Sequence, residues 1–258
     1  HNYALGYYAL HAITSGACNI ALGNSAGQNM ATGSENIAIG HSAGLYDNDG
    51  NYQIFIGCSA GHCMQGDTNI GFGFHALKGS STPGNNTGTD NIAIGMYAGC
   101  CTTSGTQNIY IGREAGSYSA TGNRNVAIGY YAMKEGVTTG YCNVVMGQCA
   151  GYKLTTAGCN VIIGTNAGFE ATQGHYNVYQ GDSAGKCNQQ GSANVFVGCY
   201  AGKGGSSPSS NSAGCNVAVG MNAGCGLVSG GDNTFIGAFA GKTTTTGNRN
   251  VAIGHNVQ

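Results

Sequence analysis

The 258-residue sequence predicts an all-β fold, a parallel β-solenoid of the β-roll or β-helix kind with about 15 coils of about 17 residues. Three observations lead to this prediction. A glycine-centred motif recurs along the chain, alternating apolar residues precede each motif glycine, and an alanine follows it at a fixed distance. Similarity at a fixed period is typical of repeat architectures, in which each unit packs only against its neighbours.

The repeat reads Asn-(Ile/Val)-x-(apolar)-Gly-x-x-Ala-Gly and is followed by a polar stretch. Ten of the fourteen intervals between motif glycines are equal in length, and the two longest intervals, called the long repeats below, also equal one another. We therefore expect one solenoid segment over residues 1–258. The motif glycines are Gly6, Gly23, Gly40, Gly57, Gly73, Gly95, Gly112, Gly129, Gly147, Gly164, Gly181, Gly198, Gly220, Gly237 and Gly254.

The three residues before each motif glycine predict a short β-strand. The first of them is Ile or Val in thirteen of fifteen repeats, and the third is nearly always a large apolar residue. Alternating β-branched residues beside a turn glycine are typical of a strand with one buried face. The alanine three residues after the glycine, present in fourteen repeats, predicts a tight inner corner.

The middle residue of each predicted strand points to the opposite face and is never charged. It is Ala in seven repeats and otherwise Phe55, Gly71, Tyr110, Val145, Ile162, Tyr179, Phe196 or Phe235. Both faces of the strand are thus apolar, which is typical of a strand covered on both sides. We expect the middle-residue stripe to lie between parallel copies of the chain, and we predict a homotrimer.

Asparagine occupies the position four residues before the motif glycine in fourteen repeats, and Gln53 is the exception. In stacked coils these side chains would hydrogen-bond in a ladder along the stack. The alternative is that each asparagine caps its own turn. The expected ladder consists of Asn19, Asn36, Asn69, Asn91, Asn108, Asn125, Asn143, Asn160, Asn177, Asn194, Asn216, Asn233 and Asn250.

A longer period overlies the short one. The long repeats carry matching insertions, Lys78–Pro83 and Lys203–Pro208, and the octapeptide Gly122–Gly129 is identical to Gly247–Gly254. The same offset relates Met96 to Met221 and Cys100 to Cys225. We predict that a seven-coil block of about 125 residues is duplicated, with the two copies at about 1–133 and 134–258.

Composition narrows the function classes. The net charge is −1 and only 7% of residues are charged, without a basic run, so no nucleic-acid partner is expected. No apolar stretch approaches the ~20 residues of a membrane span. Twelve cysteines and the low charge favour an extracellular, cell-surface or virion location. The chain begins and ends within the repeat, so we expect it to be a segment of a longer protein.

The Asn-Val-Ala-Ile-Gly core at Asn125–Gly129 and Asn250–Gly254 resembles the repeats of trimeric autotransporter adhesin heads. With Thr121-Gly122 before it, the motif is also similar to repeats of bacteriophage tail fibres. The resemblance implies a left-handed β-roll of three chains, although the coil of this chain is longer than the adhesin unit. It implies a structural extracellular fibre, the shaft or head of a trimeric phage tail fibre or bacterial surface adhesin, and it assigns no functional residues.

Candidate ligand sites are few. Asp47, Asp49 and Asn51 lie in an Asp-Asn-Asp-Gly-Asn segment that resembles the start of a calcium loop, but the completing glutamate is absent and these residues are also common in turns. Cys142 and Cys159 lie five residues before consecutive motif glycines, so we expect their Cα atoms about 5 Å apart, within disulfide range. No other metal and no cofactor is expected.

No nucleophile elbow, phosphate loop or pair of carboxylates is present, so we expect no catalytic residues and no enzyme activity. Two further functions remain open beside the trimeric fibre. One is a subunit of a self-assembling extracellular filament. The other is a receptor module that binds cell-surface glycans through a stripe of residues just after the motif glycine, Tyr97, Tyr130, Tyr131, Tyr200 and His41.

Overall fold

A computed structural model describes residues 1–136, 139–205 and 211–258. In these residues the chain is all-β, a β-solenoid of short parallel strands that recur once in every repeat, and this confirms the predicted fold class. The chain divides into two compact units, His1–Arg124 and Asn125–Gln258, called the first and second unit below. Each is described by itself.

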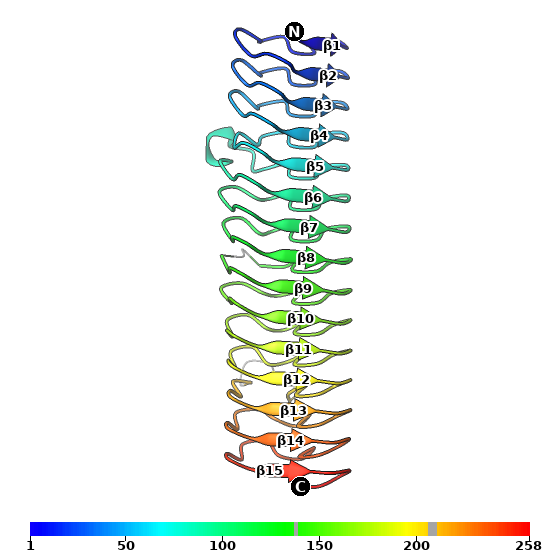
Figure 1. Cartoon of the computed structure of the whole chain (residues 1–258), viewed down its shortest axis with the longest axis vertical. Coiled ribbons are helices and arrows are strands. Elements are labelled where there is room, and N and C mark those ends of the chain that lie inside the picture. The colour runs from blue at the N-terminus through cyan, green and yellow to red at the C-terminus, as the bar shows by residue number, and fades with distance from the viewer. Residues whose placement is uncertain (137–138, 206–210) are drawn as a thin grey trace. The chain divides into compact units, whose positions relative to one another are not determined.

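The first unit contains β1 (Tyr3–Leu5), β2 (Ile20–Leu22), β3 (Ile37–Ile39), β4 (Ile54–Ile56), β5 (Ile70–Phe72), the short 3-10 helix η1 (Pro83–Asn85), β6 (Ile92–Ile94) and β7 (Ile109–Ile111). The second unit contains β8 (Val126–Ile128), β9 (Val144–Met146), β10 (Val161–Ile163), β11 (Val178–Gln180), β12 (Val195–Val197), β13 (Val217–Val219), β14 (Thr234–Ile236) and β15 (Val251–Ile253). Figure 1 shows the strands of each unit stacked in chain order.

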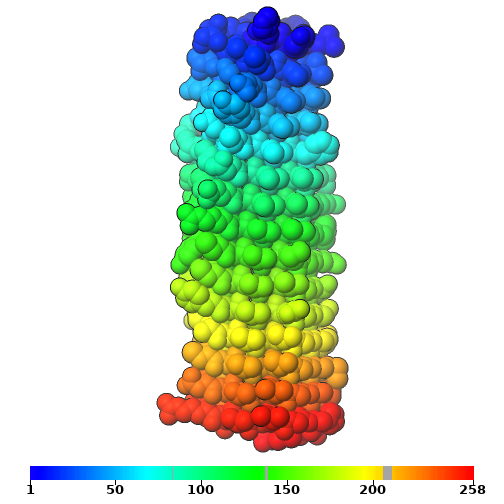
Figure 2. All heavy atoms as spheres, in the orientation of Figure 1, coloured from blue at the N-terminus to red at the C-terminus, as the bar shows by residue number. Residues whose placement is uncertain are grey.

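Within each unit every strand pairs in parallel with the next, motif position on motif position. Ile20 pairs with Ile37, for example, and Ala21 with Ala38. The long repeats keep this register, since Ile70 still pairs with Ile92 across the insertion. The extra residues are therefore accommodated in the connecting loop. Figure 2 shows successive coils of each unit lying directly against one another.

The motif glycines are required by the backbone. All fifteen adopt positive φ, from 121° at Gly237 to 142° at Gly6, in a region that side-chain-bearing residues rarely occupy. The stack adds a second constraint, because a Cβ on Gly23 would lie 2.6 Å from the carbonyl oxygen of Gly40 in the next coil. A glycine at this position thus allows both the turn and the close approach of the coils.

The middle strand residue points into the interior of its own coil, so the prediction that this stripe lies between chains is wrong. Ala21, Phe55, Tyr110 and Ile162 are at most 1% exposed within the single chain. The first and third residues of the strands point outward and are half-buried or exposed. A narrow coil has a single interior, and the middle strand residue, which varies in size between repeats, packs there.

Beside the buried alanine that follows each motif glycine, three positions fill the interior, and their volumes compensate one another. They are the middle strand residue and the residues four and seven after the motif glycine. Phe55 is followed by Gly61, where a Cβ would lie 2.3 Å from the Phe55 ring. Where the middle residue is Gly71, the position four after the motif glycine Gly73 holds the buried Leu77. Alternating large and small residues keep the core close-packed.

The boundary between the compact units, at Arg124, differs from the block boundary expected near residue 133. The duplication remains a prediction from the sequence. Of its paired insertions, Lys78–Pro83 falls within the described residues and carries the start of η1. Lys203–Pro208 extends into 206–210, which lie outside the described residues.

Candidate functional site

The most extensive candidate surface is the outer stripe, defined here as the first and third residues of every strand. None of its positions is charged in any of the fifteen repeats. In the first unit it includes Phe72, 52% exposed, and Ile94, 42% exposed. In the second unit its polar members are Gln180 and Thr234, and the rest is aliphatic apart from Met146. Each unit therefore presents a mainly apolar ribbon of sheet.

The outer stripe is regular as well as apolar. Parallel strands recur about every 4.8 Å, and the in-register pairing places each Ile or Val above another at that spacing. Large apolar surfaces of this kind on soluble proteins usually mark contact sites. A second copy of the same ribbon has the same spacing, so its side chains would interdigitate without a change of register.

The ladder asparagines of the second unit hydrogen-bond along the stack. The Asn143 Nδ2 donates to the Asn125 Oδ1 at 2.9 Å, and the Asn160 Nδ2 donates to the Asn143 Oδ1 at 3.0 Å. The Asn160 Nδ2 also donates to the Gly174 carbonyl oxygen in the next coil, at 2.9 Å. These amides are buried, and such pairing avoids the cost of leaving them unsatisfied.

The first unit has the same ladder with an interruption at Gln53. The backbone N–H of Gln53 donates to the Asn36 Oδ1 at 2.8 Å, but neither side-chain polar atom of Gln53 has a hydrogen bond among the described residues. Asn69 donates instead to the Gly66 carbonyl oxygen of its own turn, at 2.7 Å, and to that of Gly88 at 2.8 Å. Local capping and stacking thus both occur.

The calcium candidates are not gathered around one point. Asp47 is fully buried in the coil interior, and Asp49 is exposed. The Asn51 Oδ1 accepts from the backbone N–H of Ser34 at 3.0 Å, so it is already used within the stack. The described residues contain no group of three His, Cys, Asp or Glu side chains that could hold a metal ion.

Burial raises the pKa of the Asp47 carboxyl well above its usual range, although a hydrogen bond from the Gly50 N–H to its Oδ1, at 3.0 Å, acts in the opposite direction. The Asp47 Oδ2 has no hydrogen bond among the described residues. Sequence reasoning missed this burial. The signal was the position of Asp47 seven residues after Gly40, where other repeats carry Met30, Met64 or Leu154.

The structure holds Cys142 and Cys159 as free thiols, so the bond predicted between them is not formed in it. All twelve cysteines are described and all are free. Cys142 and Cys159 have positive φ, 54° and 59°, in the turn before the strand.

The aromatic stripe after the motif glycines gathers rings across coils. In the second unit Tyr130 stacks on Tyr131 at 3.8 Å between ring centroids, and Tyr131, Tyr152 and Phe169 continue the row at 6.3 and 4.8 Å. In the first unit Tyr97 packs edge-on against Phe74 at 5.3 Å. Among the residues that the structure describes, the exposed His41 and Tyr200 make no ring–ring contact that extends these rows.

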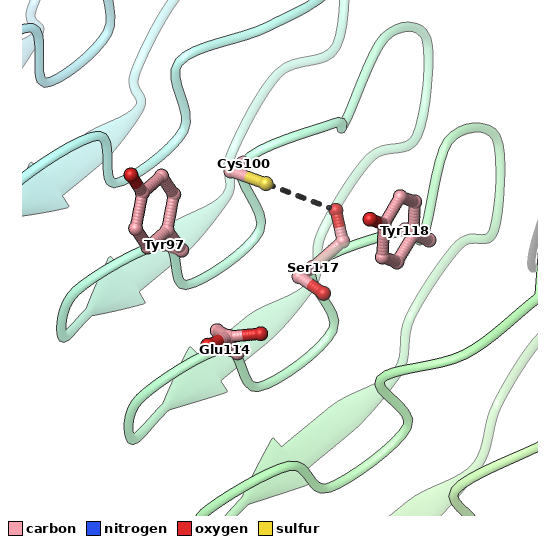
Figure 3. Close-up of a pocket in the computed structure, with 5 residues that line it drawn as sticks. All are labelled: Tyr97, Cys100, Glu114, Ser117 and Tyr118. Carbon is pink, nitrogen blue, oxygen red and sulfur yellow. Dashed lines mark hydrogen bonds between the residues drawn. The ribbon is translucent and has the colours of Figure 1, made fainter.

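A surface cavity of about 270 Å³ opens between the coils of β6 and β7. It is lined by Tyr97, Cys100, Glu114, Ser117 and Tyr118. Figure 3 shows Tyr97 and Tyr118 on either side of the Cys100 thiol, which points to the Ser117 carbonyl oxygen. Sequence reasoning missed this cavity, which forms only where residues of two stacked coils meet.

In comparisons with known proteins, no family model matches the chain, and neither the curated proteins nor the solved structures give a match. Within the described residues there is no helix of the length and apolarity needed to cross a membrane.

Proposed function

We propose that the chain is a segment of a structural extracellular fibre, the shaft or head of a trimeric phage tail fibre or bacterial surface adhesin, without enzyme activity. The observation that carries this proposal is the uncharged outer stripe, which each unit leaves uncovered. Three parallel copies arranged around an axis would each turn this one stripe toward the centre. In this proposal the first and third residues of each strand, and not the middle residues, form the interface between chains.

The resemblance of the Asn-Val-Ala-Ile-Gly core to adhesin-head and tail-fibre repeats supports the choice of three chains. The twelve cysteines and the low charge support an extracellular, cell-surface or virion location. Repeat coils gain stability mainly from their neighbours, so burial of the outer stripe would add stability along the whole segment.

The experiment compares two phenylalanines of one coil. Phe72 lies on the outer stripe and Phe74 on the aromatic stripe, 52% and 41% exposed. We expect the unaltered chain to sediment as a trimer and Phe72→Glu to shift it to monomer, because a buried unpaired carboxylate is costly. Phe74→Glu is the matched control and should remain trimeric.

Sedimentation measures the outcome, and cryo-electron microscopy of the cross-section counts the chains. A monomeric unaltered chain at micromolar concentration would overturn the trimer. Single chains joined end to end would favour the alternative, a subunit of a self-assembling filament. If both variants remain trimeric, the outer stripe is not part of the interface.

A glycan-binding module is the second candidate function, and the row Tyr130, Tyr131, Tyr152 and Phe169 favours it. Aromatic rings offer flat apolar faces on which sugar rings stack. Retention of the chain on immobilised polymers of N-acetylglucosamine tests it. Tyr130→Ala should abolish retention, and Tyr176→Ala, at an exposed tyrosine outside the row, should not.

A further inference from the structure

Two adjacent cysteines lie at a corner of the coil that contains β6. The Sγ atoms of Cys100 and Cys101 are 3.5 Å apart, and both residues are half-buried. Cys100 lines the cavity of about 270 Å³ described above (Figure 3). Cys100 thus faces the cavity, and the Cys101 thiol, which is half-buried, lies directly beside it and outside the lining.

The next coil holds both cysteines through a single acceptor, the Ser117 carbonyl oxygen. The Cys100 Sγ lies 3.4 Å from it, and the backbone N–H of Cys101 donates to it at 2.9 Å. The shared acceptor places the Cys100 side chain and the Cys101 backbone against the same atom of the next coil.

The two thiols differ in acidity. The hydrogen bond from the Cys100 thiol lowers the pKa of Cys101 to about 7, with burial opposing this shift and Lys78 adding to it. The same hydrogen bond and burial raise the pKa of Cys100. Near neutral pH a substantial fraction of Cys101 is thus thiolate, the reactive form, while its neighbour carries a proton.

We propose that Cys100 and Cys101 form a redox-active dithiol site that reacts with small-molecule disulfides and closes to a vicinal disulfide. The Cys101 thiolate attacks one sulfur of the disulfide RSSR, forms a mixed disulfide and releases RS⁻. Cys100 then loses its proton to RS⁻ and attacks the Cys101 sulfur, which releases the second RS⁻. That thiolate takes a proton from solvent, which balances the proton that Cys101 released when it ionised. RSSR is thus reduced to two RSH, and the dithiol is oxidised to a disulfide.

Geometry indicates that the product is labile rather than a structural cross-link. Adjacent Cα atoms are about 3.8 Å apart, below the ~4.4–6.8 Å that disulfides usually span. A strained disulfide is more easily reduced than a relaxed one. The pair would therefore respond to changes in the surrounding thiol–disulfide balance.

The chain contains its own single-thiol control. Cys225 lies five residues after Gly220, as Cys100 does after Gly95, but its neighbour is Gly226 instead of a second cysteine. Its Sγ contacts the Lys242 carbonyl oxygen at 3.8 Å, and burial raises its pKa. Cys225 thus occupies the corresponding position of its coil without a partner sulfur.

The experiment equilibrates the full chain with mixtures of oxidised and reduced glutathione at fixed pH, then traps free thiols and analyses peptides by mass spectrometry. We expect the peptide with Cys100 and Cys101 to lose two hydrogens without bound glutathione. Cys225 should carry glutathione or stay reduced. Cys101→Ser should make Cys100 behave as Cys225 does.

The proposal is overturned if Cys101 accumulates bound glutathione while Cys100 stays free. It is also overturned if the pair stays reduced in the most oxidising mixture, or if Cys101→Ser leaves the loss of two hydrogens unchanged. Hydrogen exchange of the β6 and β7 amides shows whether each variant is folded, which keeps loss of structure separate from loss of the site.

Discussion

Two turns of the molecule occupy the same place in the repeat but carry different polar side chains. Asp47 and Gln53 of the first unit correspond to Asn188 and Asn194 of the second, seven residues after one motif glycine and four before the next. The turn itself is the same in both. The Gly50 N–H donates to the Asp47 Oδ1 at 3.0 Å, and the Gly191 N–H donates to the Asn188 Oδ1 at 2.9 Å.

The difference lies in what the side chains offer to the next coil. The Asn188 Nδ2 donates to the Ala213 carbonyl oxygen at 3.0 Å, a bond that a carboxylate cannot make. Asn194 is bonded on both sides, whereas the longer Gln53 leaves both amide atoms without a hydrogen bond among the described residues. The turn tolerates an acid, and the stacking of coils favours the amide.

The largest loss of stability is expected when an aspartate, as at position 47, replaces the corresponding asparagine of the second unit. Asn188→Asp should lower the local stability around β11 and β12 by about 3 kcal/mol at neutral pH, because the bond to Ala213 is lost and the second oxygen of a buried carboxylate is left without a donor. Hydrogen exchange of the Val178 and Val195 amides, which bond to the following coils, measures the loss.

The control is Asn248→Asp in the same unit. Asn248 is exposed, and its Oδ1 accepts from the Gly231 N–H at 2.7 Å, a contact that aspartate keeps. Exchange near β14 should change by less than about 0.5 kcal/mol. Equal effects of the two substitutions would show that the contrast between Asp47 and Asn188 has no energetic meaning.

A smaller effect should follow from removal of one ladder side chain in each unit. Asn194→Ala removes the bonds to Asn177 and Ala213 and leaves the Asn216 amide short of an acceptor, which should cost about 2 kcal/mol. Gln53→Ala removes no side-chain hydrogen bond to a neighbouring coil, only the interaction of its amide with the Asp47 carboxyl, and should cost less than about 1 kcal/mol.

Opening free energies at the Val195 and Ile54 amides compare the two variants, since both amides bond to the following coil. Similar losses at both positions would mean that the ladder contributes little beyond the burial of side-chain atoms. A larger loss for Gln53→Ala would reverse the comparison of the two units.

The sequence alone was sufficient for the strands, their register and the glycine turns, since each follows from a period that recurs in every repeat. It did not show which face of the strand lies inside, because period-two alternation separates two faces without ranking them when both are apolar. Size covariation was the missing signal. Phe55 and Tyr110 occur with Gly61 and Gly116, while Gly71 occurs with Leu77.

The candidate sites depended on three-dimensional placement that spacing does not fix. Asp47, Asp49 and Asn51 are close in sequence, yet a turn sends the first inward and the second outward. Cys142 and Cys159 share a position in adjacent coils, yet such a position sets the Cα separation and not the direction of the thiols. Cys100 and Cys101 needed only their adjacency to be noticed, and their shared acceptor at Ser117 comes from the stack.

The smallest effect concerns the pH dependence of the turn at Asp47. Its pKa is raised by burial, so the folded state binds a proton that the unfolded chain releases near pH 3.8. Stability around β3 and β4 is then fully present below that pH and declines as pH rises through the raised value. Asp47→Asn should abolish the decline and stabilise these coils at neutral pH by about 1 kcal/mol, by giving the side chain the donor that Asn188 has.

Exchange at the Ile37 and Ile54 amides between pH 4 and 8, corrected for the intrinsic rate at each pH, measures both expectations. Exchange at Val178 in the second unit is the reference, since Asn188 does not titrate. If β3 and β4 become more stable as pH rises, the folded state holds Asp47 as a charged group, and its pKa is lowered instead of raised. If Asp47→Asn leaves the profile unchanged, another group titrates there, and the two turns differ only in their hydrogen bonds to the next coil.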